Sequence, residues 1–168
     1  SLGGRIGVHL LQNNPDQFDH YIFLSTNPGL TEAENAEKNK RLMSDMKWAS
    51  QISETNWNEF VKSWNQQPVF EGSSQEPERH SGNYDLNKLK RALVMWTLAQ
   101  QEDFRPLIQE FKDKITWMVG EKDSKYLQIA ESMKQKKILL DYKRISSGHR
   151  IWLDQPTAIS NLLIDLLK

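Results

Sequence analysis

The sequence predicts an α/β fold with a parallel sheet flanked by helices, because short apolar runs alternate with stretches of helical periodicity. Three runs have the pattern of strands: Tyr21 to Ser25, Ile115 to Val119, and Ile138 to Tyr142. Each is bounded by polar residues and is apolar enough to be buried on both faces. Three strands cannot make a doubly wound sheet with two covered faces, so we expect further strands upstream of Ser1.

Helices are expected wherever apolar residues recur at spacings of three and four. Thr31 followed by Glu34 is a capping box, which predicts a helix that starts there and runs toward Gln51. Pro156 suits a first helical turn, and the final helix that it opens is expected to face inward with Ile159, Leu162, Leu163 and Leu166. Further helices are expected over Leu2 to Gln12, Trp57 to Trp64, Leu86 to Trp96, and Lys125 to Met133 with Ser124 as N-cap.

The stretch from Thr31 to about Phe104 has helical periodicity and a polar loop, Glu71 to Asn83, but no strand pattern. It lies between the first two expected strands. We therefore expect a core formed by residues 1–30 and 105–168, with residues 31–104 inserted as a helical cap.

The composition is that of a globular chain of ordinary domain length. Its 168 residues are 38% hydrophobic, and 22 basic residues balance 22 acidic ones. Zero net charge gives no indication of nucleic acid or an anionic membrane as a partner. The absence of cysteine excludes disulfides and thiolate metal sites, and no His, Asp and Glu spacing indicates another metal site. No apolar run could span a bilayer and no signal peptide opens the chain, so we expect a cytoplasmic location.

Three residues carry candidate chemistry in the order Ser1, Asp123, His149. A serine hydroxyl is a poor nucleophile or base until a histidine takes its proton, and a carboxylate must hold that histidine in the right tautomer. Asp123 lies just past the second expected strand, and His149 lies in the loop after the third. Open α/β sheets bind ligands at the carboxyl ends of their strands, so we expect these two side chains to converge. In Leu2-Gly3-Gly4, the two glycines suit the tight turn that a nucleophilic serine needs.

Simpler interpretations stand beside this one. Ser1 could be a frayed, solvated terminus, and a histidine after glycine in a loop is often a surface residue. The remaining histidines, His9, His20 and His80, are expected to be structural or solvated. The stripe that contains Trp57 and Trp64 is most simply a core face, although Trp64 could equally line a pocket.

Several stretches resemble one family: Ser1 to Arg5, Asn27 to Leu30, Arg41 with Asp45 and Trp48-Ala49, Gly120 to Tyr126, and Trp64-Asn65-Gln66-Gln67-Pro68-Val69-Phe70. Within the last of these, Gln66-Gln67-Pro68-Val69-Phe70 is unusually specific. Over its whole length the chain is similar to the 2-succinyl-6-hydroxy-2,4-cyclohexadiene-1-carboxylate (SHCHC) synthases of menaquinone biosynthesis. The resemblance implies an α/β-hydrolase fold with a helical cap. It also implies that this chain is the C-terminal part of that fold, starting at the nucleophile turn. The oxyanion-hole segment would then lie upstream, in a required N-terminal half.

The resemblance further implies a reaction and a set of site residues. The family eliminates pyruvate from a cyclohexene that carries several carboxylates, uses no cofactor, and is thought to use the triad serine as a base. Carried over by position, Ser1, Asp123 and His149 form the triad. The substrate-binding residues are Arg5, Arg41, Arg79 and Trp64, with the spacing around Arg79 departing from the family pattern. Arginine suits a small anionic substrate because it binds carboxylates in a bidentate, charge-assisted way.

Other functions fit the same residues. One is a carbon–carbon bond or ester hydrolase of this fold, with Ser1 as covalent nucleophile on a carboxylated substrate. Another is an inactive fragment or binding module. An N-terminal-nucleophile hydrolase is a third, but the helix-rich insert and the placement of Asp123 and His149 argue against it.

Overall fold

The computed structural model describes residues 1–74 and 76–166, which divide into two compact units. The first unit comprises Ser1–Pro28, Pro68–Glu76 and Phe104–Lys168, and the second comprises Gly29–Gln67 and Pro77–Asp103. Residues 68–76 thus group with the unit that contains the strands, although they lie between two stretches of the other unit in the sequence.

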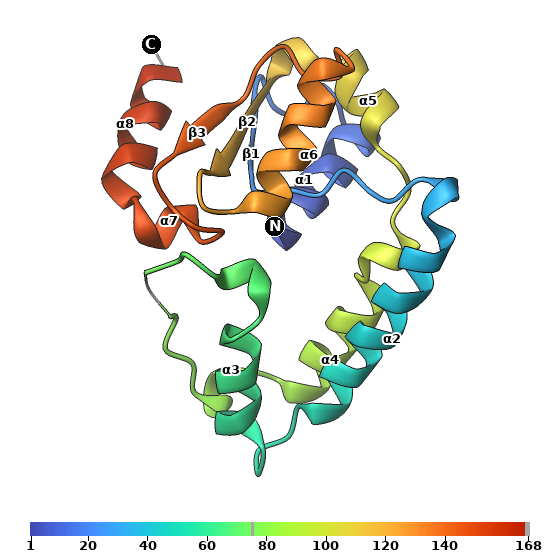
Figure 1. Cartoon of the computed structure of the whole chain (residues 1–168), viewed down its shortest axis with the longest axis vertical. Helices are drawn as coiled ribbons and strands as arrows, with labels where there is room; N and C mark the ends of the chain where they lie inside the picture. The colour runs from blue at the N-terminus through green and yellow to red at the C-terminus, as the bar shows by residue number, and fades with distance from the viewer. Residues whose placement is uncertain (75, 167–168) are drawn as a thin grey trace. The chain divides into compact units, whose positions relative to one another are not determined.

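A parallel sheet forms the centre of the first unit (Figure 1). Its strands follow the order β1 (Tyr21–Leu24), β2 (Ile115–Gly120) and β3 (Lys143–Ile145). Phe23 of β1 is in register with Trp117 of β2, and Val119 of β2 with Arg144 of β3. Because all pairings are parallel, the carboxyl ends of the three strands lie at one edge of the sheet.

The third strand lies further along the chain than the sequence predicts, and the expected strand from Ile138 to Tyr142 is wrong. The amides of Ile138 and Leu139 both donate to the carbonyl oxygen of Met133, and Lys137 has a left-handed φ of 59°. These residues therefore complete the end of the preceding helix. Ile138 and Leu139 are apolar because they are buried in the core from this turn.

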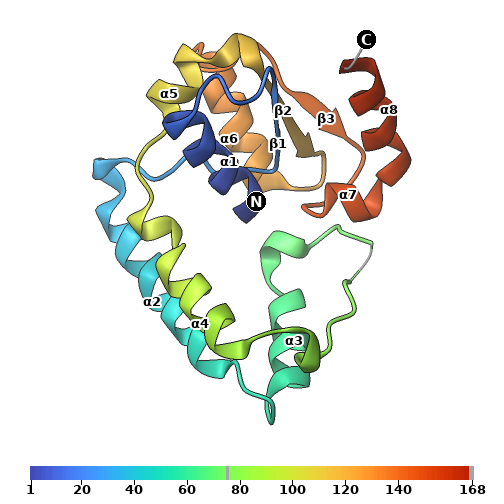
Figure 2. The ribbon, with the colours of Figure 1, turned by 180° about the vertical axis from the view of Figure 1, so that it is seen from behind.

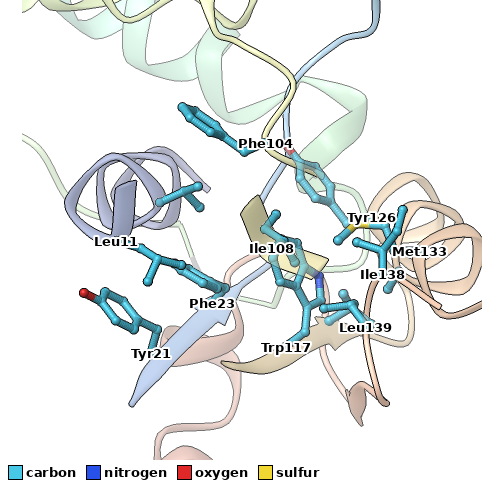
Figure 3. Close-up of a cluster of buried hydrophobic side chains, with 13 residues drawn as sticks. Leu11, Tyr21, Phe23, Phe104, Ile108, Trp117, Tyr126, Met133, Ile138 and Leu139 are labelled. Carbon is cyan, nitrogen blue, oxygen red and sulfur yellow. The ribbon is translucent and has the colours of Figure 1, made fainter. Parts of the chain in front are cut away.

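The helices described in the first unit are α1 (Leu2–Asn13), α5 (Arg105–Glu110), α6 (Ser124–Gln135), α7 (Ile151–Asp154) and α8 (Pro156–Leu166), with a 3-10 turn, η5, at Lys112–Lys114 and another, η2, at Pro68–Phe70. Among these helices, α1, α5 and α6 contribute residues to the buried core around the sheet. Contacts of α1 are mainly with β1 and those of α6 mainly with β2 (Figure 2). Figure 3 shows the buried side chains that gather between these helices and the strands. Phe23 and Trp117 are central to this cluster, with ring centroids 5.4 Å apart.

The final helix differs from its expected burial. No residue of α8 is buried; Ile159 and Leu162 are half-buried, whereas Leu163 and Leu166 are 39% and 38% exposed. Within the described residues, α8 makes its extensive contacts with α7 rather than with the sheet. The prediction of an inward face is therefore wrong for Leu163 and Leu166.

The second unit is helical, and no strand occurs among its described residues. It contains α2 (Asn35–Gln51), α3 (Trp57–Asn65) and α4 (Leu86–Met95), with 3-10 turns at Glu32–Glu34, Ser81–Asn83 and Leu98–Gln100. The capping box is confirmed, because the amide of Thr31 donates to the Glu34 carboxylate at 2.7 Å. Ile52, Trp57 and Phe60 form the buried core of this unit.

We predict that Ile108→Ala lowers the free energy of unfolding, because Ile108 is fully buried against the sheet cluster. The lost apolar contacts and the resulting cavity should cost about 2–5 kcal/mol, measured by urea denaturation. Ile164→Ala makes the same chemical change on α8, where Ile164 is 51% exposed, and should change the value by less than about 0.5 kcal/mol. Equal losses in the two variants would contradict this account of the core.

Candidate active site

The loops that follow β2 and β3 are joined closely at the carboxyl edge of the sheet. The amide of Glu121 donates to the carbonyl oxygen of Ile145 at 2.8 Å, and that of Lys122 to Ser147 at 3.0 Å. Gly120, the last residue of β2, leaves no room for a side chain, because a Cβ there would collide with the carbonyl oxygen of Gly148. The loop that carries Asp123 and the loop that carries His149 therefore form one packed structure.

Asp123 and His149 form a buried hydrogen-bonded pair. His149 Nδ1 lies 2.7 Å from Asp123 Oδ2, and the two residues are only 2% and 3% exposed. A carboxylate accepts hydrogen bonds, so Nδ1 carries the proton in this pair and the lone pair of the neutral ring lies on Nε2. This is the tautomer in which a histidine can take a proton from a serine hydroxyl. The expected convergence of these two side chains is thus observed.

The position of Asp123 on α6 also corrects the expected helix start. Ser124 was expected to be the N-cap, but it is the first helical residue, and Asp123 occupies the N-cap position. The Asp123 side chain makes no capping hydrogen bond. Its carboxylate instead faces His149, which shows that the local preference of aspartate for helix caps is overridden by the tertiary contact.

Two aromatic rings surround the His149 imidazole, and sequence reasoning assigned neither of them a role. The Tyr126 ring centroid lies 4.7 Å from that of His149, and the Phe70 centroid lies 5.8 Å away. Both belong to stretches singled out by the family resemblance, which was the available signal. The imidazole of His149 is thus contacted by the Asp123 carboxylate and by both rings.

Ser1 lies at the same edge of the sheet, at the N-cap position of α1. Its backbone nitrogen donates to the carbonyl oxygen of Leu24, the last residue of β1, at 2.6 Å. Gly4 packs tightly against the loop after β1, because a Cβ at this position would collide with Thr26. Arg5, one residue further, is buried at 8% exposure. The start of α1 thus requires the small residue that the sequence offers at Gly4.

The other three candidate residues belong to the second unit. Arg41 Nε binds Asp45 Oδ2 at 2.8 Å, with the Arg41 side chain 37% exposed and that of Asp45 4% exposed. The carbonyl oxygen of Arg79 accepts a hydrogen bond from Trp57 Nε1 at 2.9 Å. Trp64 is partly buried and packs edge-on against Trp48, with centroids 5.3 Å apart. Trp64 is therefore part of the aromatic core of its own unit.

The remaining histidines have other surroundings. His9 packs edge-on against Phe104 at 4.7 Å, His20 Nε2 lies 2.8 Å from Thr116 Oγ1, and His80 is exposed. In the part of the chain that the structure describes, no group of three or more His, Asp or Glu residues could hold a metal ion. None of the helices described is long and apolar enough to cross a membrane.

Comparison with known proteins shows what this chain is similar to. No family model matches it. A Klebsiella pneumoniae protein named SHCHC synthase is 27% identical over 172 residues, which is 99% of this chain and 66% of that protein. An Escherichia coli protein of the same name is 24% identical over 100% of this chain and 66% of its own length. The chain resembles SHCHC synthases along its whole length. It spans about two thirds of the length of these relatives.

Solved structures agree on the fold. The structure of MenH from S. aureus superposes with a TM-score of 0.78 at 23% identity, covering 99% of this chain and 65% of that one. A structure reported with the activity profiles of carboxylesterases from a Thaumarchaeon, Nitrososphaera gargenis, has a TM-score of 0.59 at 14% identity, covering 99% and 62%. The parallel sheet with its helices is thus an α/β-hydrolase-like fold.

We predict a pH dependence of stability for a chain whose first residue is Ser1. Burial lowers the pKa of the Ser1 α-amino group to about 5; the Arg5 guanidinium adds to this effect, and the Asp123 carboxylate opposes it. Between pH 5 and pH 8 the unfolded chain then binds more protons than the folded one, so stability rises with pH. The free energy of unfolding from urea titrations should rise by up to about 4 kcal/mol across this range.

Acetylation of the Ser1 nitrogen supplies the matched control, because an amide cannot take up a proton in this range. The acetylated chain should lack this part of the rise. The same slope in both forms would contradict a buried amine at Ser1.

Proposed function

We propose that the full-length protein eliminates pyruvate from 2-succinyl-5-enolpyruvyl-6-hydroxy-3-cyclohexene-1-carboxylate, which yields SHCHC in menaquinone biosynthesis. This would make it a carbon–oxygen lyase. The observation that carries the proposal is the buried Asp123–His149 pair, 2.7 Å apart, at the carboxyl edge of the sheet where Ser1 also lies. Similarity to proteins named SHCHC synthase supports this substrate over others.

In the proposed reaction, Ser1 acts as a base. His149 Nε2 takes the proton of the Ser1 hydroxyl, and the serine oxygen removes a proton from a ring carbon of the substrate. The electrons of the broken C–H bond form a new ring double bond, the existing ring double bond shifts by one position, and the C–O bond to the enolpyruvyl group breaks. The departing pyruvate enolate takes up a proton and becomes pyruvate. Asp123 holds the productive tautomer of His149 and stabilises the imidazolium that forms. This proposed reaction needs no cofactor.

We further propose that Arg5, Arg41 and Arg79 bind the substrate carboxylates and that Trp64 lines the pocket, with residues 31–104 acting as the cap. Arg5 has the strongest support, because it is buried one turn after Ser1. A guanidinium can bind a carboxylate through two parallel hydrogen bonds. The implied partner is a small anionic molecule in the cytoplasm rather than nucleic acid or a membrane.

We also propose that activity requires an N-terminal half of the same fold in addition to these residues. The chain corresponds to about two thirds of its relatives, and β1 pairs only with β2 in the described sheet. Leu2, Ile6 and Leu10 form a stripe on α1, at spacings of four, and each is 38–40% exposed. Such a stripe would suit a further layer of the fold.

The second candidate is a carbon–carbon bond or ester hydrolase that acts on a carboxylated substrate. The same Asp123–His149 pair would then activate Ser1 as a covalent nucleophile. Likeness to the structure reported with carboxylesterases favours keeping this candidate. A non-catalytic binding module is the third.

A coupled pyruvate assay on the full-length protein tests these candidates. We expect pyruvate release from the enolpyruvyl substrate, and a loss of about 10²–10⁴-fold in kcat for His149→Ala, because a positioned acid–base group is removed. His20→Ala, which alters an exposed histidine bound to Thr116, is the matched control and should retain activity. Ester hydrolysis with an acyl-enzyme mass shift, but no pyruvate, would favour the hydrolase. Binding without either reaction would favour the binding module.

Substitution of the arginines tests the proposed carboxylate sites. Arg5→Ala or Arg41→Ala should lower kcat/KM by roughly 2–5 kcal/mol in transition-state free energy, because one partner of a charged hydrogen-bonded pair is lost. Arg5→Lys keeps the positive charge and a long side chain at this buried position but cannot bind a carboxylate in a bidentate way. A loss of kcat/KM in this variant therefore indicates a binding defect rather than a folding defect. Arg91→Ala, on the exposed side of α4, serves as control. Kinetics that are unchanged in all variants would rule out these sites.

A further inference from the structure

The main chain on both sides of His149 is bonded to other parts of the first unit. On one side, the amide of Gly148 donates to Asp154 Oδ2 at 3.0 Å. On the other, the amide of Arg150 donates to Ser73 Oγ at 3.1 Å. His149 thus lies between two residues whose backbone amides both have side-chain acceptors.

A single carboxylate connects these two attachments. While Oδ2 of Asp154 accepts from Gly148, Oδ1 accepts from the amide of Ser74 at 3.0 Å and from its hydroxyl at 3.1 Å. Ser74 directly follows Ser73, which holds the amide of Arg150. Asp154 therefore joins the segment Phe70–Ser74 to the loop of His149 through both of its oxygen atoms.

Close packing supports the same contact. A Cβ on Gly148 would collide with the backbone of Gly72 and Ser73. The two backbone segments therefore pass each other without room for a side chain at Gly148. The guanidinium of Arg150 lies 3.9 Å from the centroid of the Phe70 ring, and this ring in turn contacts His149. Arg150 is only 2% exposed, so this cation–π contact is shielded from water and stronger than an exposed one.

We propose that Asp154 is a positioning residue for His149. It holds the segment Phe70–Ser74 against the histidine loop, so that the imidazole stays hydrogen-bonded to Asp123, as the proposed role of its Nε2 requires. Asp154 acts through backbone amides and touches no reacting atom. The effect on turnover rests on the proposed function, whereas the effect on the imidazole does not depend on it.

A carboxylate at position 154 can accept hydrogen bonds on both oxygens, and an amide cannot. Hydrogen bonds to an ionised carboxylate are stronger than those to a neutral acceptor, and Asp154 accepts on both oxygens. Asparagine has almost the same shape but one acceptor oxygen; its amide nitrogen can only donate. In Asp154→Asn, the side-chain NH₂ must therefore face the backbone N–H of either Gly148 or Ser74. Two donors cannot bond to each other, so one of the two hydrogen-bonded attachments is lost.

The experiment compares Asp154→Asn with wild type in the full-length protein. We expect kcat for pyruvate release to fall by about 10–100-fold with KM unchanged, because small misplacements of a catalytic group reduce rate more than binding. In proton NMR spectra, the Nδ1 proton of His149, assigned by its absence in His149→Ala, should exchange faster with water. Ser74→Ala, which removes only the hydroxyl donor, should show a smaller change in the same direction.

Asp141→Asn is the matched control, because Asp141 is an exposed carboxylate that also accepts from a backbone amide, that of Tyr142 at 2.8 Å. It should leave both readouts unchanged. The proposal is overturned if Asp154→Asn leaves the Nδ1 proton exchange as in wild type. Should Asp154→Asn fail to fold, Ser74→Ala decides by the same criterion. Absence of pyruvate release by wild type would refute the proposed function alone, since the NMR readout still tests the position of His149.

Discussion

Parallel pairing of β2 with β3 decides where the candidate chemistry of this protein lies. It brings the ends of both strands to one edge, and the two loops that follow are then bonded to each other through Glu121 and Lys122. Gly120 allows these loops to approach within contact of their backbones. Asp123 and His149 meet as a consequence, although they are 26 residues apart in the sequence.

A polar site of this kind is stable only because its groups are paired with one another. Leaving a buried polar group without a partner costs roughly 1–3 kcal/mol, and more for a charged one. Here the carboxylate of Asp123 binds His149 instead of capping α6, and the amides of Gly148 and Arg150 both have acceptors. Beneath these polar residues, the cluster around Phe23 and Trp117 supplies the apolar burial of the unit.

The stretch Gln66-Gln67-Pro68-Val69-Phe70 shows how a resemblance acquires a physical meaning. Similarity to the SHCHC synthases singled it out without giving a reason. In the structure Val69 packs against the main core and Phe70 against His149, while Gln67 belongs to the helical unit. The stretch therefore contains the point at which the chain passes from one unit into the other. Its last residue, Phe70, contacts the candidate catalytic histidine.

Local patterns were enough to locate β1, β2, the capping box at Thr31 and the convergence of Asp123 with His149, because each depends on residues near in sequence or on the general geometry of parallel sheets. The strand expected at Ile138 was wrong, since an apolar run looks the same in a strand and in a buried turn. Nothing in the sequence indicated the bonds between Ser74 and Asp154, which are 80 residues apart. Such contacts depend on how distant segments pack, and only the tertiary structure decides that.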